Sequence, residues 1–220
     1  MGAGGVGAGD SYGGYRSQLV ETLQQKGIRD LAVLRAVGTV PRHLFVPESV
    51  RHRAYDDAAL PIGGGQTISQ PWVQARYLEL CALTGRERVL EVGAGSGYQT
   101  GLLAQLADGV FAVERIPALA QQARAALEAA GIRNVTVLVG DGTLGWRAFA
   151  PYDAILVAAA SPEVPLPLIE QLAPGGRLVI PIGNRDSQVL TLVQRVGDEV
   201  QTRTVADVRF VPLLGEFGFR

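Results

Sequence analysis

The chain has 220 residues, of which 47% are apolar and 19% charged, and its formal net charge at pH 7 is -1. This length fits one sizeable α/β domain and leaves little room for a second. A charge near zero gives no general attraction for nucleic acid or for an anionic membrane, so we expect neither as a partner. No apolar run approaches the ~20 residues that span a bilayer.

Cysteine and histidine are scarce. Cys81 is the only cysteine, which excludes an internal disulfide and favours a reducing compartment. His43 and His52 are the only histidines, so the usual zinc ligands are too few and we expect no metal. These counts favour a cytoplasmic protein.

The first residues are rich in Gly and Ala. Residues 1–14 lack the basic segment and apolar core of a signal peptide, so we expect a flexible leader before a single domain at 15–220. Myristoylation is the alternative interpretation, but Val6 stands where that motif has Ser or Thr. The expected helices and chain ends show no exposed apolar stripe, which favours a monomer.

Three helices are expected before the glycine-rich centre of the chain. Apolar residues at helical spacing predict a helix over 15–26, and Asp30 suits the N-cap of a second short helix. Residues 51–65, rich in charge, Pro and Gly, are expected to form a loop. Pro71 suits the first position of a helix that ends near residue 83. The residues expected to form its core face are Val73, Tyr77, Leu80 and Cys81.

From residue 88 onward, strands and helices alternate. This alternation predicts a doubly wound, mostly parallel, Rossmann-like sheet with helices on both faces. After residue 181 two long alternating strands, joined at Gly197-Asp198, predict an antiparallel C-terminal hairpin. The expected strands are 88–92, 110–114, 135–139, 154–158, 177–181, 188–195 and 200–208, and the expected helices are 98–107, 117–130 and 167–172.

The first strand of this alternation runs into a glycine-rich turn. Gly93, Gly95 and Gly97 follow the strand and precede a helix, an arrangement typical of nucleotide sites. The turn lacks the Gly-Lys-Ser/Thr of a P-loop, and Tyr98 occupies the place of the third glycine in the dinucleotide fingerprint. Both features disfavour a phosphate ligand.

Acidic residues end the next strands. Glu114 can accept hydrogen bonds from both ribose hydroxyls of an adenosine group, although a solvated acid at a strand end is the simpler alternative. Asp141, followed by Gly142, can accept a hydrogen bond from the adenine amine, or can form an ordinary Asp-Gly turn. With Glu91, these acids favour a cationic ligand, and S-adenosylmethionine carries a sulfonium and an ammonium group.

Several segments together resemble the protein-L-isoaspartate O-methyltransferase family, over about residues 19–213. The glycine turn is shared by many methyltransferases, whereas Gln66-Thr-Ile-Ser-Gln-Pro71 is specific to this family. The similar segments are 40–42, 59–71, 89–100, 112–115, 140–142, 150–155, 172–183 and 209–213.

The resemblance implies methyl transfer from S-adenosylmethionine to the α-carboxylate of an L-isoaspartyl residue in damaged proteins and peptides, with S-adenosylhomocysteine as the product. The ester would close to a succinimide, whose hydrolysis returns part of the material to aspartate. By resemblance Ser69 is the catalytic residue. The residues implied to bind the cofactor are Gln66, Thr67, Ile68, Ser69, Gly93, Ala94, Gly95, Gly97, Glu114, Arg115, Asp141 and Gly142.

The chemistry of Ser69 can also be argued directly. A carboxylate is already a nucleophile at pH 7, so catalysis reduces to alignment of the reacting atoms and exclusion of water. The Ser69 hydroxyl can donate a hydrogen bond to the acceptor carboxylate, and it can also cap the helix that begins at Pro71. Gln74 stands where some family members have histidine, and residues 159–165 form either a rim of the substrate cleft or a connector.

Two alternatives remain open. The chain could esterify an unmodified aspartate in a specific peptide, although it has no added domain for such a substrate. It could also be a cofactor-binding module without catalysis that acts by interaction, although Ser69 and the cofactor acids argue against this.

Overall fold

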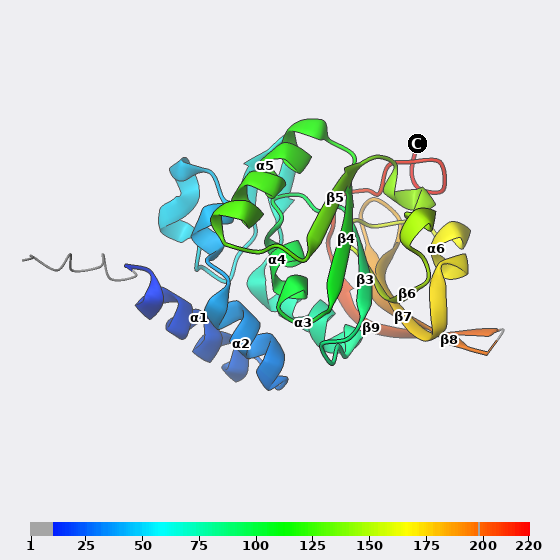
Figure 1. Ribbon diagram of the computed structural model, residues 1–220, viewed down its shortest axis with the longest axis horizontal. Helices are drawn as coiled ribbons and strands as arrows, with labels where there is room; N and C mark the ends of the chain where they lie inside the picture. The colour runs from blue at the N-terminus through cyan, green and yellow to red at the C-terminus, as the bar shows by residue number, and fades with distance from the viewer. Residues whose placement is uncertain (1–10, 198) are drawn as a thin grey trace, which may run out of the picture.

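The computed structural model describes residues 11–197 and 199–220, and its centre is a seven-stranded sheet (Figure 1). The strands are β3 (Arg88–Val92), β4 (Gly109–Glu114), β5 (Val135–Val139), β6 (Tyr152–Val157), β7 (Leu172–Gly183), β8 (Gln188–Val196) and β9 (Glu199–Val208). They lie in the order β5-β4-β3-β6-β7-β8-β9. Neighbours from β5 to β7 are parallel, and β8 is antiparallel to both β7 and β9. The predicted doubly wound sheet with an antiparallel C-terminal hairpin is confirmed; Asp198 of the predicted turn lies outside the described residues.

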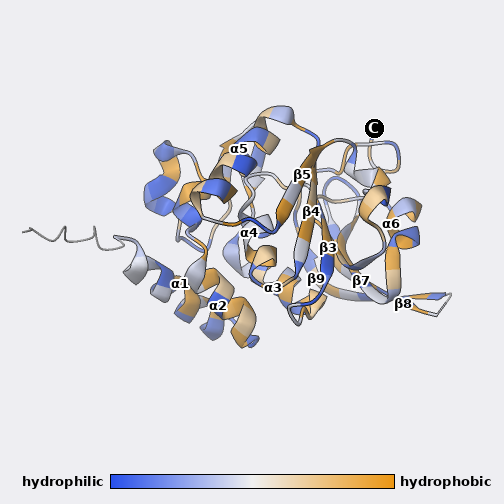
Figure 2. Cartoon of the chain, in the orientation of Figure 1, coloured by the Kyte–Doolittle hydropathy of each residue, from blue (hydrophilic) through white to orange (hydrophobic). Residues whose placement is uncertain are grey.

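The central strands are buried on both faces. In β6, Ala154 and Leu156 belong to one hydrophobic core, whereas Ile155 and Val157 belong to the other. Successive side chains of a strand point to opposite faces, so a strand covered on both sides reads as a continuous apolar run. Figure 2 shows such an apolar stretch along β4.

Helices cover the two faces unequally. The helices are α1 (Gly13–Gln25), α2 (Leu31–Thr39), α3 (Pro71–Cys81), α4 (Tyr98–Ala104), α5 (Pro117–Ala129) and α6 (Leu166–Glu170). In Figure 1, α3, α4 and α5 lie on one side of the central strands and α6 on the other. Helices α1 and α2 pack against each other and against α3. They are the additional N-terminal helices predicted from the sequence. Within the described residues, no helix is long and apolar enough to cross a bilayer.

The N-terminal helices begin close to their predicted positions. Asp30 caps α2 as predicted, because its side chain accepts hydrogen bonds from the backbone N–H groups of Ala32 and Val33 at 2.8 and 3.2 Å. Residues 1–10 of the predicted leader lie outside the described residues. Helix α1 begins at Gly13, two residues before the predicted domain start at residue 15. The Tyr12 ring stacks on His43 with 4.0 Å between ring centroids.

The expectation of a loop over 51–65 is wrong for much of that range. A 3-10 helix, η2 (Glu48–Arg53), is followed by a hairpin of β1 (Leu60–Gly63) and β2 (Gln66–Ile68). Leu60 and Ile62 are buried while the residues between and after them are exposed, so this short strand alternates as an amphipathic strand does. Gly63, Gly64 and Gly65 all have positive φ and form the turn. Strand β2 holds Gln66 to Ile68, and Ser69 follows it just before α3 begins.

Candidate active site

A pocket of about 890 Å³, its open mouth included, lies at the carboxyl ends of the central parallel strands. The chain leaves β3 towards β4 and β5 and later returns to β6 on the other side of β3, so the strand order reverses here. In open α/β sheets, ligands bind at this kind of switch point. The lining residues are 66–69, 74, 91–96, 99, 113–116, 142, 158–159 and 211–214.

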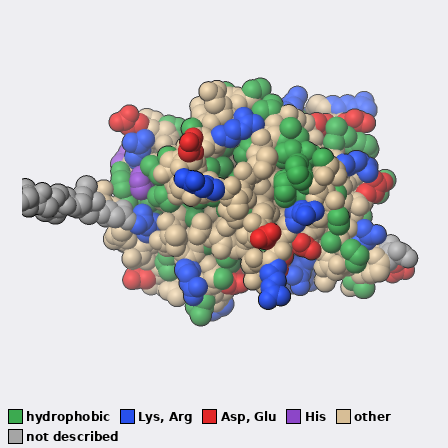
Figure 3. Space-filling view, viewed as in Figure 1, with side chains coloured by type: hydrophobic (Ala, Val, Ile, Leu, Met, Phe, Trp, Pro, Cys, Tyr) green, Lys and Arg blue, Asp and Glu red, His purple; other side chains and the backbone are tan. Residues whose placement is uncertain are grey.

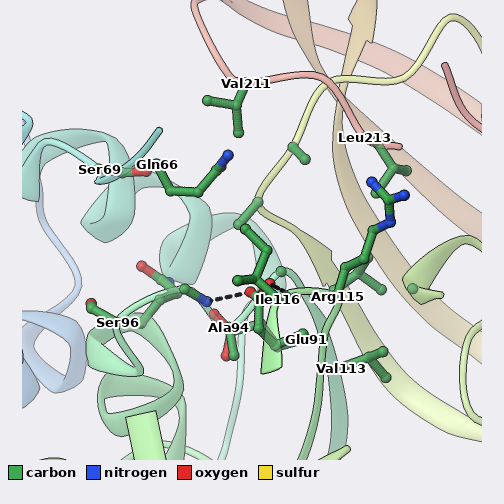
Figure 4. A pocket seen from close by; sticks show the side chains of 18 of the residues that line it. Gln66, Ser69, Glu91, Ala94, Ser96, Val113, Arg115, Ile116, Val211 and Leu213 are labelled. Atoms are coloured by element: carbon green, nitrogen blue, oxygen red, sulfur yellow. Dashed lines mark hydrogen bonds between the residues drawn. The ribbon is translucent and has the colours of Figure 1, made fainter. Parts of the chain in front are cut away.

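The pocket has two walls (Figure 4). Gln66 and Ser69 lie on one side, and Arg115 and Leu213 lie on the other, with Glu91 below them near Ala94. The first wall comes from β2 and the residue that follows it, and the second from the segments that follow strands β4 and β9. The glycine turn after β3 lies between the two walls.

The three glycines of the turn have different structural roles. Gly93, Gly95 and Gly97 all have positive φ, which side chains other than glycine rarely adopt. Gly93 and Gly95 line the pocket, whereas Gly97 does not. A Cβ on Gly97 would lie 3.0 Å from the Cβ of Ala123, so Gly97 lets α4 pack closely against α5. Its predicted cofactor contact therefore stays a prediction, while its packing role is direct.

Glu114 holds the turn in place. Its Oε2 accepts a hydrogen bond from the Gly95 N–H at 2.8 Å, and its Oε1 accepts one from the Ile116 N–H at 2.8 Å. An ionised carboxylate offers about four acceptor sites, so two remain for a ligand. The side chain is buried yet lines the pocket, which argues against the alternative of a solvated acid at a strand end.

Glu91 is an unusual group in this position. It is fully buried and lines the pocket, and the Thr100 hydroxyl donates a hydrogen bond to its Oε2. Its Oε1 is buried with no hydrogen-bond partner among the described residues. Burial raises the pKa of Glu91 to about 8, and the neighbouring charge of Glu114 adds to the rise while the bond from Thr100 opposes it. A buried carboxyl with one unpartnered oxygen suits a cationic ligand.

Asp141 lies at the same end of the sheet but engages the chain itself. Its Oδ1 accepts hydrogen bonds from the backbone N–H and hydroxyl of Thr143, at 2.9 and 2.7 Å, and its Oδ2 accepts one from the Glu216 N–H at 2.8 Å. Partial burial alone would raise the pKa of Asp141, but these hydrogen bonds lower it below its usual value. Gly142 lines the pocket and Asp141 does not, so the adenine contact of Asp141 stays a prediction.

The Ser69 segment forms the opposite wall. Ser69 follows β2, and its backbone carbonyl accepts a hydrogen bond from Nη2 of Arg42 at 2.9 Å. The alternative role of Ser69 as the cap of α3 is wrong, because the N-cap is Gln70 and the Trp72 N–H donates to Oδ1 of Asp57 at 2.8 Å. Within the described residues the Ser69 hydroxyl makes no protein hydrogen bond, and it lies on the pocket.

Comparison with known proteins identifies the family. The model of the protein-L-isoaspartate(D-aspartate) O-methyltransferase family matches residues 15–218. The chain belongs to this family. A protein-L-isoaspartate O-methyltransferase from Roseiflexus sp. is 54% identical over 200 residues, covering 91% of this chain and 92% of the relative. One from Colwellia psychrerythraea is 53% identical over 197 residues, covering 89% and 91%.

Solved structures agree with this membership in the protein-L-isoaspartate O-methyltransferase family. A structure of a protein-L-isoaspartate O-methyltransferase superposes with a TM-score of 0.85 at 30% identity, covering 92% of this chain and 67% of the other. A Plasmodium falciparum protein, solved in complex with S-adenosyl-L-homocysteine, gives a TM-score of 0.81 at 27% identity, covering 91% and 98%. The predicted fold class and family resemblance are thereby confirmed.

Most of the residues that the family resemblance implied meet in the pocket. Ten of the twelve predicted cofactor residues line it, and Gly97 and Asp141 do not. Of the segment 159–165, only Ala159 reaches the lining. The ten are Gln66, Thr67, Ile68, Ser69, Gly93, Ala94, Gly95, Glu114, Arg115 and Gly142.

Sequence reasoning assigned no site role to the segment before the C-terminus. Residues 211–214 line the pocket, and Leu213 belongs to the core on the α6 side of the sheet. The available signal was the family-like segment 209–213, which ends on this wall. Gln74 and Gln99, whose side chains are largely buried, also line the pocket without having been predicted as cofactor residues.

Proposed function

We propose that the protein transfers a methyl group from S-adenosylmethionine to the α-carboxylate of L-isoaspartyl residues in damaged proteins and peptides, and so begins their repair. The observation that carries the proposal is that the family-specific Ser69 segment and the glycine turn with Glu114 face one pocket. The product ester would close to a succinimide, whose hydrolysis returns part of the material to aspartate.

The pocket residues fit such a methyl donor. The glycine turn permits close approach of the backbone, and the unpartnered Oε1 of Glu91 can take a cationic group of the ligand. Glu114 would hold ribose hydroxyls, and Gly142, which lines the pocket, would lie against the base. When bound, S-adenosylmethionine supplies a methyl group made electrophilic by its sulfonium.

The acceptor needs orientation more than activation. A carboxylate is ionised at pH 7, so no side chain has to remove a proton from it. The Ser69 hydroxyl would donate a hydrogen bond to one carboxylate oxygen and direct the other along the line of displacement. Residues 211–214 would help to close the pocket against water, because they line it and Leu213 lies across from Ser69.

Two matched peptides test the proposal. The assay measures methyl-ester formation on an isoaspartyl peptide and on its aspartyl twin, and calorimetry measures the binding of S-adenosylmethionine. We expect turnover of the isoaspartyl peptide only. Equal turnover of the twins would favour esterification of unmodified aspartate, and binding without turnover would favour the interaction module.

The proposal extends to partners and setting. On the face shown in Figure 3, Lys and Arg side chains are interspersed with Asp and Glu, which supports the absence of a nucleic-acid partner. The free, buried thiol of Cys81 supports a cytoplasmic setting. We further propose that residues 15–220 act as one domain and as a monomer, which light scattering after size-exclusion chromatography would test.

A further inference from the structure

Arg42 is a buried cation behind the wall of the pocket that carries Ser69. It begins the 3-10 helix η1 (Arg42–Phe45) and is 0% exposed. Its Nη1 donates to Oε1 of Gln74 at 2.7 Å and its Nη2 donates to the Ser69 carbonyl at 2.9 Å. Burial lowers the pKa of Arg42 only to about 10, with Tyr98 and Asp57 opposing the change, so the guanidinium remains charged at neutral pH.

No carboxylate within the described residues forms an ion pair with Arg42. Asp57, which contributes to its electrostatic surroundings, is itself paired with Lys26 at 2.6 Å. A buried charge without an ion-pair partner is costly to a fold, typically by several kcal/mol. Arg42 therefore leaves a positive charge directly behind the residue that faces the acceptor carboxylate.

The contacts of Arg42 also connect the Ser69 wall with the helix that follows the glycine turn. Its guanidinium carbon lies 4.6 Å from the ring centroid of Tyr98, the first residue of α4 after the glycine turn. The next residue, Gln99, donates from Nε2 to the Gln74 carbonyl at 3.5 Å. One side chain thus bonds to the Ser69 segment and to α3, and stacks on the helix that continues the glycine turn.

We propose that Arg42 is a positioning residue for methyl transfer, which fixes the Ser69 segment relative to the glycine turn and favours the anionic acceptor through its charge. This inference rests on the proposed function. Arg42 does not line the pocket, so it acts through Ser69 and Gln74 and not by contact with the ligand. Displacement of a reacting group by about 1 Å can cost about 100-fold in rate. Loss of the hydrogen bond from Arg42 to the Ser69 carbonyl should therefore lower kcat.

Two substitutions separate geometry from charge. Arg42→Lys keeps the charge but cannot donate to Ser69 and Gln74 as a two-pronged fork. We expect its kcat with an isoaspartyl peptide to fall about 10- to 100-fold while the Kd for S-adenosylhomocysteine stays within about twofold.

Gln74→Glu tests the charge. It keeps the shape of the contact and places a carboxylate beside the guanidinium of Arg42. Neutralising the charge should raise the peptide KM about 10-fold, with a smaller change in kcat.

Arg195→Lys is the matched control. Arg195 lies on β8 and, like Arg42, donates from Nη1 to a backbone carbonyl, that of Leu172, at 2.8 Å. It should keep kcat and KM within about twofold. The Tm of every variant is measured, and because Arg42→Lys could fail to fold, Gln74→Glu stands as the second test.

The proposal is overturned if folded Arg42→Lys and Gln74→Glu both retain wild-type kcat and KM. It is equally overturned if binding of S-adenosylhomocysteine is lost in parallel with turnover, which would mean a general structural role. Absence of isoaspartyl turnover by the wild type would overturn the proposed function as well. Turnover by the wild type with unchanged variants would overturn the Arg42 proposal alone.

Discussion

At the scale of single residues, Glu91 illustrates how a fold prepares for a charged ligand. Its carboxyl is buried beside Glu114, and it receives one hydrogen bond, from Thr100. The raised pKa, about 8, means that the empty pocket holds a proton there at neutral pH. A cationic ligand favours the ionised form and would expel that proton.

The affinity for S-adenosylmethionine should therefore rise with pH up to about 8 and level off above it. The cationic ligand lowers the pKa of Glu91, which is raised before binding. Binding therefore releases a proton only below about pH 8, where Glu91 of the free protein is protonated. Calorimetry between pH 6 and 9, in two buffers of different ionisation enthalpy, measures this release.

Glu91→Gln provides the control for this prediction. The ammonium group of the ligand also titrates in this range, but it does so with both proteins, so the difference between their profiles isolates Glu91. Parallel profiles for the wild type and Glu91→Gln would contradict the prediction.

Ser69 allows a second prediction at this scale. If its hydroxyl donates a hydrogen bond to the acceptor carboxylate, Ser69→Ala should lower kcat/KM about 10- to 100-fold, because such a bond to a charged group contributes about 1.5–3 kcal/mol. Catalysis should not be abolished, since no proton transfer depends on the serine. Steady-state kinetics with an isoaspartyl peptide measure the effect, with exposed Ser17→Ala on α1 as the control. An unchanged kcat/KM would exclude the contact.

At the scale of elements, helix α3 owes its start to a residue distant in the chain. The Trp72 N–H is bonded to Oδ1 of Asp57, and Oδ2 of Asp57 accepts from Gln70 at 3.1 Å and pairs with Lys26. Because α3 begins directly after the Ser69 segment, Asp57 fixes both the helix and the wall of the pocket. Asp30, the N-cap of α2, likewise accepts backbone N–H groups at the start of a helix, but it does not adjoin the Ser69 segment.

These two caps form a matched pair of substitutions. Asp57→Ala and Asp30→Ala should each lower the free energy of unfolding by about 1 kcal/mol, measured by urea denaturation. Only Asp57→Ala should also lower kcat/KM with the isoaspartyl peptide, because only that cap adjoins Ser69. Equal activity of the two variants would show that the start of α3 does not control the site.

At the scale of the whole molecule, the sequence predicted local regularities well and distant contacts poorly. Strands β3 and β5 match their predicted bounds, since each is a short, mostly apolar run between clear turn residues, although only β3 is largely buried. The β1–β2 hairpin was missed because strands of four and three residues carry too little periodicity to distinguish them from a loop.

The residues of the site also fall into those that could be predicted from local sequence and those that depend on distant contacts. Glycines and acids at strand ends could be predicted, because the carboxyl ends of parallel strands meet at one edge. The hold of Arg42 on Ser69, 27 residues away, and the bond between Glu216 and Asp141, 75 residues away, depend on tertiary packing. Neither contact has a periodic signal in the sequence.

A whole-molecule prediction follows from the position of the pocket between distant segments. S-adenosylhomocysteine at 100 times its Kd should stabilise the folded protein by about 2.7 kcal/mol. For a chain of this size, Tm should then rise by about 5–10 °C in a thermal scan. ATP and NAD at equal concentration should leave Tm unchanged, and an equal rise with either would contradict the preference for an S-adenosyl ligand over phosphate-bearing nucleotides.

The two walls of the pocket have separate origins, and this gives the enzyme a modular construction. Residues 91–116 and 142 belong to the alternating strands and helices. Residues 66–69 come from a hairpin and the residue after it, and among the described residues this hairpin pairs with no strand of the main sheet. Exchanging the hairpin would leave the hydrogen bonds between Glu114 and the glycine turn intact. The scaffold therefore suits redesign, in which a grafted hairpin redirects the same methyl donor to a different acceptor.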